Sequence, residues 1–310
     1  MGADAHWVAV PPDRDEQPVQ CFGAFTADLY ALAAWLRQCQ IETVVMESTG
    51  VYGITLFEVL EERGFDVKLV DPHAARQVPG RKTDVKDGQW LQELHTSGLL
   101  RGAFRPADEV CVVRSSLRQR SRLVTMASRA VPPMQKALEQ MHRKLTEVVS
   151  DSTGKTGMTI IRAILAGERD PQRLATYRDK RCKHDHATIA KALTGHWRAE
   201  HLFALQQAVD QDDFLAQQLR ACDGHIEGCL QACVPDVETD APPSPPARTW
   251  RSSRSNPPSF DVPAYLEAMT GVDLTQIDGI DSLTALKVMS EMGLDMTRWP
   301  TSKHCASWLG

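Results

Sequence analysis

The first hundred residues combine short apolar runs with amphipathic segments, a pattern typical of an α/β domain. Two apolar runs separated by a polar turn open the chain and predict a β-hairpin. Two later β-branched runs fit buried strands, and each follows a segment with helical spacing of its leucines. Thr26 or Asp28 can cap the first helix, and Gly64 can end the second. The resulting order, β-β-α-β-α-β, predicts a mixed sheet flanked by helices. The expected strands are 6–10, 19–25, 41–46 and 67–70, and the expected helices are 26–38 and 52–63.

Beyond Pro79 and Gly80 the character of the chain changes, and several long stretches have apolar positions at helical spacing. Pro132 and Pro133 fall inside the longest of these stretches, where their missing N–H groups predict a kink or a break. The segment 240–263 is rich in proline, serine and arginine, which predicts a flexible linker and a domain boundary. The expected helical stretches are 84–100, 107–149 and 199–232, followed by a compact helical unit at 264–310.

Charge is distributed unevenly along the chain. The formal net charge of the 310 residues is −5, which by itself does not favour nucleic-acid binding. Residues 101–144, however, hold ten lysines and arginines against three acids. Basic side chains along a helix can follow a nucleic-acid backbone and make binding sensitive to salt. The solvated face of a coiled coil is the commoner use of such charge. The arginines that we single out for nucleic-acid contact are Arg114, Arg118, Arg120 and Arg122.

The eight cysteines are scattered and form no Cys-x-x-Cys pair, which indicates a reduced cytoplasmic protein. The chain shows neither a signal peptide nor an apolar run of membrane-spanning length, which leads to the same expectation. Cys222, Cys229 and Cys233 share a helical face, but His225, the fourth ligand that zinc would need, lies elsewhere on the helical wheel. We therefore interpret these cysteines as core residues. The cysteine and two histidines in 182–186 have a polar setting that predicts an exposed loop.

Three carboxylates suggest a metal site. Glu47 directly follows the buried run 41–46, at the end of a central strand where α/β sheets build their sites. Asp84 and Asp87 are three residues apart on an expected helix and share one face. Carboxylates gathered in this way repel one another unless they bind cations, and their oxygens suit Mg²⁺ or Mn²⁺. Two such ions would assist phosphodiester cleavage. The commoner interpretation is a solvated loop glutamate and two surface aspartates that complement the helix dipole.

The segments around these acids resemble a known family. Residues 45–52 read Val-Met-Glu-Ser-Thr-Gly-Val-Tyr, and residues 78–87 read Val-Pro-Gly-Arg-Lys-Thr-Asp-Val-Lys-Asp. Together they are similar to the DEDD transposases of bacterial insertion sequences in the IS110 family, specifically its IS1111 branch. The similarity covers essentially the whole chain and includes 7–12, 98–101, 164–171 and 279–293.

This resemblance implies an RNase H/RuvC-like N-terminal domain in which four acids (Asp, Glu, Asp, Asp) bind divalent metal. Glu47 corresponds to the second of these acids, Asp84 to the third and Asp87 to the fourth. Arg81 and Lys82, which precede the aspartates, are expected to contact nucleic acid. The implied organisation is a RuvC-like domain at 1–105, a helical coiled-coil region at 106–239, the linker at 240–263, and the start of a C-terminal transposase domain at 264–310.

The resemblance also implies partners. These are the DNA of the element ends and target, a structured guide RNA encoded by the element, and further copies of the chain in a homodimer or higher homo-oligomer. The expected location is the cytoplasm, in association with the nucleoid. Residues 274–285 resemble a helix-hairpin-helix turn in which the backbone at Gly279 could contact a phosphate. A plain packing unit of helices explains this turn equally well.

The chain departs from the family pattern at both ends. The family's first Asp would align just before Met1, and Asp4 falls in the turn before the first strand, where it is a poor substitute. The Ser proposed as the recombination nucleophile would align beyond Gly310, and Ser302 and Ser307 precede that place. We therefore expect a chain truncated at both ends that does not complete transposition as written.

Three functional hypotheses follow. The leading one is a metal-dependent DNA transposase that cuts and rejoins phosphodiester bonds. The second is a catalytically inactive remnant that still dimerises and binds nucleic acid. The third is a structural α/β protein, which would show no salt-dependent binding to RNA or DNA.

Overall fold

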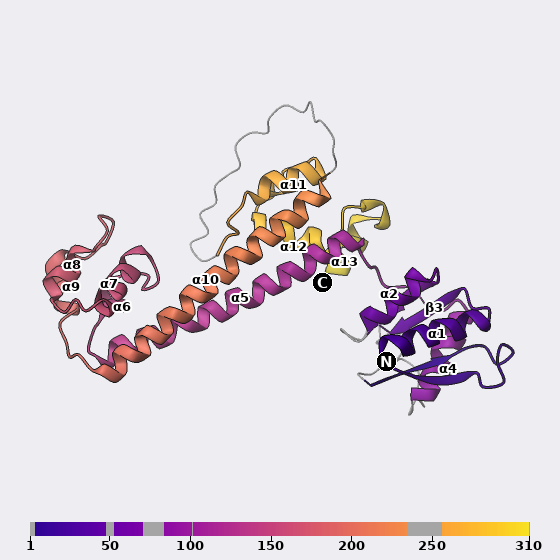
Figure 1. Cartoon of the computed structure of the whole chain (residues 1–310). Helices are drawn as coiled ribbons and strands as arrows, with labels where there is room; N and C mark the ends of the chain where they lie inside the picture. Colours follow the sequence, from indigo (N-terminus) through magenta and orange to yellow (C-terminus); the bar gives the residue numbers. More distant parts are fainter. Residues whose placement is uncertain (1–3, 48–52, 71–83, 101, 235–255, 310) are drawn as a thin grey trace. The chain divides into compact units, whose positions relative to one another are not determined.

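The computed structural model describes residues 4–47, 53–70, 84–100, 102–234 and 256–309. Its contacts divide the chain into two compact units, Met1–Arg105 and Pro106–Gly310 (Figure 1). Each unit is described separately below. Arg81 and Lys82 lie outside the described residues, and so does the side chain of Asp84.

The first unit contains two pairs of strands. Strands β1 (Ala5–Ala9) and β2 (Val19–Gly23) form the expected antiparallel hairpin, with Trp7 opposite Cys21. Strands β3 (Thr43–Glu47) and β4 (Asp66–Val70) are parallel, with Glu47 opposite Val70. The single mixed sheet that the sequence predicts is not observed: among the described residues, β1 pairs only with β2, and β3 only with β4. A cavity separates the two pairs, as described below.

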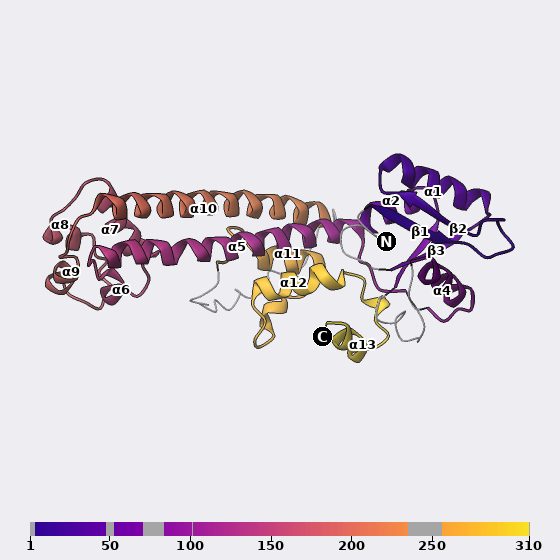
Figure 2. The ribbon, with the colours of Figure 1, turned by 90° about the horizontal axis from the view of Figure 1, so that it is seen from below.

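Three helices cover these strands. Helices α1 (Thr26–Gln38) and α2 (Ile54–Glu62) pack against each other, while α4 (Asp84–Thr96) packs against β1, β2 and β3. Figure 2 shows α1 and α2 on one side of the strands and α4 on the other. The N-cap of α1 is Phe25 rather than Thr26 or Asp28, and its backbone N–H donates to the side chain of Asp28 in the first turn at 3.2 Å. Leucines of α1 and α2 form the core of this unit: Leu29, Leu32, Leu36, Leu56 and Leu60.

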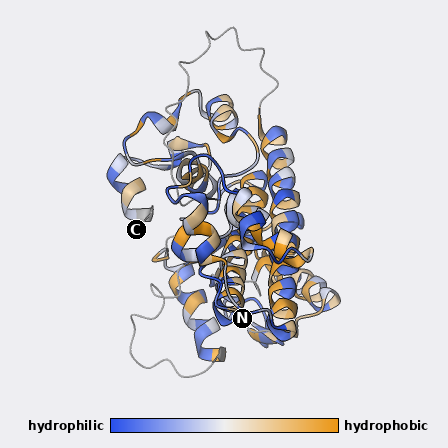
Figure 3. Ribbon diagram, turned by 90° about the vertical axis from the view of Figure 1, so that its left-hand side faces the viewer, coloured by the Kyte–Doolittle hydropathy of each residue, from blue (hydrophilic) through white to orange (hydrophobic). Residues whose placement is uncertain are grey.

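The second unit is built on two long helices that lie side by side, α5 (Asp108–Gln140) and α10 (Ala199–Cys233) (Figures 1 and 2). Of the kink or break expected at Pro132 and Pro133, the break does not occur, because helix α5 runs through both prolines. Ala130 and Met134 on either side of the prolines are fully buried, and this packing offsets the loss of helical hydrogen bonds. Figure 3 shows hydrophilic and hydrophobic residues together along the helices.

Four short helices enclose a second apolar core at one end of this pair. They are α6 (Leu145–Val148), α7 (Lys155–Leu165), α8 (Pro171–Thr176) and α9 (His186–Ala192). The polar segment that precedes α9 includes Cys182, which is only partly exposed and whose thiol lies 3.7 Å from the hydroxyl of Thr156. The fully exposed loop expected at 182–186 is therefore observed only in part.

The last described segment is helical, as the sequence predicts. It contains α11 (Val262–Thr270), α12 (Ser282–Met292), α13 (Ser302–Leu309) and the short 3₁₀ turns η2 (Leu274–Gln276) and η3 (Met296–Arg298). Leu266 and Leu286 of this segment share one buried cluster with Leu117 of α5 and Ile226 of α10. The segment after the predicted linker therefore belongs to the same unit as the long helices, because it has no separate core of its own.

A pair of glycines in the second unit gives a matched test of packing. Gly157 lies in the first turn of α7, where an added Cβ would overlap the backbone of Ser152, whereas Gly224 in α10 has open space around it. We expect Gly157→Ala to lower the free energy of unfolding by about 1–3 kcal/mol. Gly224→Ala should raise it by about 0.5–1 kcal/mol, because alanine is the better helix former. Urea unfolding of both variants measures this, and equal effects would contradict it.

Candidate active site

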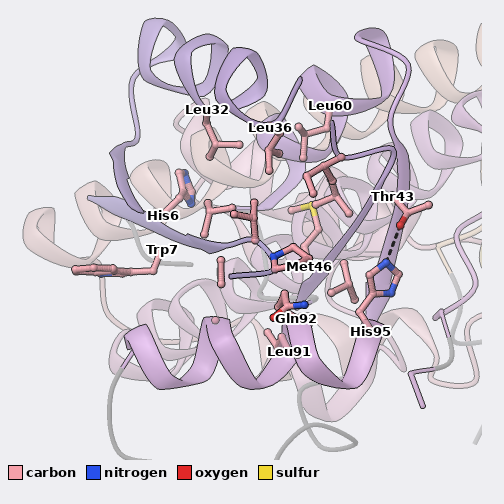
Figure 4. A pocket seen from close by; sticks show the side chains of 18 of the residues that line it. His6, Trp7, Leu32, Leu36, Thr43, Met46, Leu60, Leu91, Gln92 and His95 are labelled. Carbon is pink, nitrogen blue, oxygen red and sulfur yellow. Dashed lines mark hydrogen bonds between the residues drawn. The ribbon is translucent and has the colours of Figure 1, made fainter. Parts of the chain in front are cut away.

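The first unit contains a cavity of about 950 Å³. It lies between β1 and β3, with residues of α1 and α2 on one side and residues of α4 on the other. Figure 4 shows Leu32, Leu36 and Leu60 facing it from one side and Leu91 from α4 on the other. Five elements thus supply side chains to one space.

Glu47 is the last residue of β3, and its half-buried side chain lines this cavity. The run Thr43–Met46 forms a strand because β-branched side chains pack well on a pleated surface. The parallel partner β4 fixes the register, so Glu47 falls at the carboxyl end of the pair. Sites in α/β folds are built at this end of parallel strands.

Asp87 reaches the same cavity from α4 and is also half-buried. Asp84 begins this helix, almost one turn before Asp87. The structure therefore brings together two of the three predicted acids, Glu47 and Asp87, from elements distant in sequence. Asp4 is exposed and is not among the residues that line the cavity.

His95, which the sequence analysis did not single out, also belongs to this site. Its Nε2 lies 2.9 Å from Oγ1 of Thr43, so a hydrogen bond connects the end of α4 to the start of β3 (Figure 4). The signal was present in the sequence, because Asp87, Leu91 and His95 follow one another at intervals of four on one helical face. Partial burial lowers the pKa of His95, and the positive charge of Lys68 acts in the same direction.

This lowered pKa predicts how stability depends on pH. A group whose pKa is lower in the folded state stabilises the fold above its unfolded pKa and loses that contribution as the pH falls through the folded pKa. The melting temperature should therefore fall as the pH drops below about 6.5, the usual range of histidine. His95→Gln keeps a partner for Thr43 but does not titrate, so its melting temperature should fall less over the same interval. Identical pH profiles for the two proteins would contradict the assignment to His95.

The predicted nucleic-acid-binding arginines of α5 make contacts within the protein. Nε of Arg114 donates to the carbonyl of Ser290 at 2.9 Å, and Nη2 of Arg118 donates to Glu291 at 3.0 Å, so both hold α12 against α5. Nε of Arg120 donates to Asp223 of α10 at 2.5 Å, and the side chains of both residues are about 95% buried.

Arg120 therefore cannot reach a phosphate in this structure, and its role here is to join α5 to α10. Arg122 is exposed and donates to Gln119 of its own helix at 2.7 Å. Gly279 lies between η2 and α12 with a φ of +86°, a conformation that favours glycine.

Cys222, Cys229 and Cys233 are half-buried and pack against the apolar cluster that α5 and α10 share with α11 and α12, so they are core residues only in part. His225 lies 3.7 Å from the thiol of Cys229, nearer than the helical wheel suggested, because residues four apart are neighbours on a helix. Within the described part of the chain, no three His, Cys, Asp or Glu side chains are grouped so that they could hold a metal ion. No helix described here is long and apolar enough to cross a membrane.

Comparison with known families defines the class of protein. Residues 1–143, which include the α/β unit and the start of α5, match a DEDD transposase model of the IS110 type. Residues 273–310 match a model described as transposase, IS116/IS110/IS902 family. The chain therefore belongs to the IS110 family of transposases. No curated protein sequence matches it.

Proposed function

We propose that the protein is a DNA transposase of an insertion sequence that cuts and rejoins phosphodiester bonds with the help of divalent metal. The observation that carries the proposal is that Glu47 and Asp87, on separate elements, line one cavity. We further propose that the α/β unit has the RNase H/RuvC-like fold; a carboxylate at the end of a parallel strand and another on a helix, both lining one cavity, support this proposal. Asp84, at the start of α4, is the third proposed acid.

The side chains of Glu47 and Asp87 are suited to binding a metal ion. Carboxylate oxygens are hard ligands that favour Mg²⁺ or Mn²⁺ over softer ions. Once bound, such an ion activates water and stabilises the charge that develops on the phosphate. Glu47 and Asp87, which both line the cavity, would hold the ion through their carboxylate oxygens. His95 holds α4 in place through Thr43, and so helps to set the position of Asp87.

The proposed partners are DNA at the element ends and target, a guide RNA encoded by the element, and a second copy of the chain. The exposed basic residue Arg122 on α5 and the backbone at Gly279 are proposed nucleic-acid contacts. Arg114 and Arg118 could take part only by exchanging their contacts with Ser290 and Glu291.

The proposed metal dependence is tested with purified protein, element-end DNA and transcribed element RNA. We expect strand cleavage with Mg²⁺ or Mn²⁺, loss of cleavage with a chelator, and its recovery when Mg²⁺ is restored. Salt-dependent binding of the nucleic acids without cleavage in any metal would contradict the enzymatic proposal and support an inactive nucleic-acid-binding protein. Absence of both would exclude a role with nucleic acid.

A further inference from the structure

The short helices α6, α7, α8 and α9 form a strongly basic part of the second unit. Figure 1 shows them together at one end of α5 and α10. We call residues 141–198, which contain these four helices, the tip. The tip holds twelve lysines and arginines against six acids, whereas the whole chain has a formal net charge of −5. Such a local excess of positive charge attracts polyanions.

Most acids of the tip have a structural role. Asp170 and Asp185 accept hydrogen bonds from main-chain N–H groups in the first turns of α8 and α9, and so cap these helices. Asp151, Glu168 and Asp179 accept from main-chain N–H groups of neighbouring loop residues. These contacts explain why the acids are present, but they leave the excess of basic side chains without a structural role.

Three exposed lysines belong to this excess. Lys155 at the start of α7 and Lys183 in the loop before α9 line one cavity of about 360 Å³, and Lys180 lies in the same loop. Arg181 of this loop pairs with Asp179 at 3.1 Å, but no ion pair is found for the three lysines within the described part of the chain. Because acids line the cavity as well, the exposed lysines rather than the cavity are what a polyanion would meet.

Hydrogen bonds hold the basic loop, residues 177–185, in a defined conformation. The main-chain N–H of Asp179 donates to the hydroxyl of Thr156 in α7 at 3.1 Å. Nη1 of Arg178 donates to the carbonyl of His184 at 2.8 Å, across the loop. A loop that is already ordered loses less conformational entropy when it binds a partner. The lysines are therefore presented on a fixed surface.

One aromatic side chain is exposed in the same loop. Tyr177, which directly follows α8, is 43% exposed and is the one large hydrophobic side chain that is exposed among the described residues of the tip. A surface that binds a membrane or another protein would show several such side chains together. Basic side chains combined with an exposed aromatic ring are instead typical of surfaces that bind single-stranded nucleic acid, whose bases stack on the ring.

We propose that the tip binds single-stranded nucleic acid on this loop. Lys155, Lys180 and Lys183 contact backbone phosphates, and Tyr177 stacks on an unpaired base. Contacts to phosphates carry no sequence information, so binding is insensitive to sequence and weakens as the salt concentration rises. This inference goes beyond the proposed cleavage, because it requires neither a metal ion nor the acids of the first unit.

The experiment uses the full chain and fluorescein-labelled oligothymidylate and oligouridylate of about 15 nucleotides. Fluorescence anisotropy measures their affinities at several salt concentrations, with a chelator present so that failure of the proposed cleavage does not affect the result. The triple variant Lys155→Gln, Lys180→Gln and Lys183→Gln should bind at least about tenfold more weakly. The slope of log K against log salt should become shallower by about 2, since each phosphate contact contributes about 0.7.

A matched control removes the same charge from arginines of the tip that are already paired. It replaces Arg162, Arg173 and Arg198 with Gln; their partners are Asp213, Glu168 and Glu200. This control should change the affinity by less than about threefold, because the remaining effect of net charge is screened by salt. An equal loss of affinity in the two triple variants would overturn the proposal, since it would reduce the role of the lysines to net charge.

Two variants of Tyr177 test the stacking. Tyr177→Leu should bind the oligonucleotides about fivefold more weakly or worse, whereas Tyr177→Phe keeps the ring and should bind as the original protein does. A duplex of the same length should not respond to Tyr177→Leu. Equal binding by the leucine and phenylalanine variants, or a preference for the duplex, would overturn the assignment to single strands.

Hydrogen exchange on the unmodified chain gives a measurement that needs no variant. Residues 177–185 should exchange more slowly when an oligonucleotide is bound. Absence of this protection, or absence of binding by both oligonucleotides, would overturn the proposal. Binding of either one supports it, and the ratio of the two affinities shows whether the sugar of RNA or of DNA is preferred.

Discussion

Replacing Glu47 or Asp87 with its amide is expected to reduce metal-dependent cleavage by more than about a hundredfold, because even the partners that orient metal ligands contribute 10–100-fold. Both side chains line the cavity, and an amide oxygen is a much weaker ligand for Mg²⁺ than a carboxylate. The measurement is the rate of cleavage of element-end DNA, accompanied by titration of Mn²⁺ into each protein. Mn²⁺ affinity should fall together with the rate.

The matched control is Glu93→Gln, which makes the same chemical change at an exposed position of α4 away from the cavity. It should leave both rate and affinity unchanged. Cleavage by Glu47→Gln at the unmodified rate would remove Glu47 from the proposed metal site.

The second large effect is expected at the buried ion pair between Arg120 and Asp223. Arg120→Met should lower the free energy of unfolding of the helical unit by about 3–5 kcal/mol, because Asp223 is then left charged and buried. The substitution should also weaken the attachment of the segment that precedes α11. Arg120 donates to the carbonyl of Asn256 at 2.9 Å, and Asp223 accepts from the backbone N–H of Ser259 at 2.9 Å.

Two further variants test whether the expected loss of stability in Arg120→Met comes from an unpaired buried charge. The double variant Arg120→Met with Asp223→Leu should recover most of the lost stability, since well-packed apolar residues can replace a buried ion pair at little cost. Arg118→Met removes an arginine that is 67% exposed, and should cost less than about 1 kcal/mol. Urea unfolding followed by circular dichroism, which reports mainly on the long helices, makes the comparison. A double variant no more stable than Arg120→Met would contradict this account.

The comparison of the exposed Arg118 with the buried Arg120 explains why the charge of a sequence segment is a weak guide to its function. Arg114, Arg118, Arg120 and Arg122 form one basic stretch in the sequence and lie on one helix in the structure. Their partners, however, are as far as 177 residues away, as between Arg114 and Glu291. Only the packing of α10 and α12 against α5 decides that three of these four arginines join the protein to itself.

The sequence by itself determined the local structure and the family. Short apolar runs located the hairpin and the strands β3 and β4, and helical periodicity located α1, α2, α4, α5 and α10. The motifs around Glu47 and Asp84 indicated the IS110 transposases. These properties depend on neighbouring residues, so they can be read from short segments.

The tertiary structure decided that α5 continues through Pro132 and Pro133, that α11 and α12 share a core with the long helices, and that β1 and β3 stay apart around a cavity. An apolar face shows that a residue will be buried but not which distant element will bury it, and only the complete packing defines that partner.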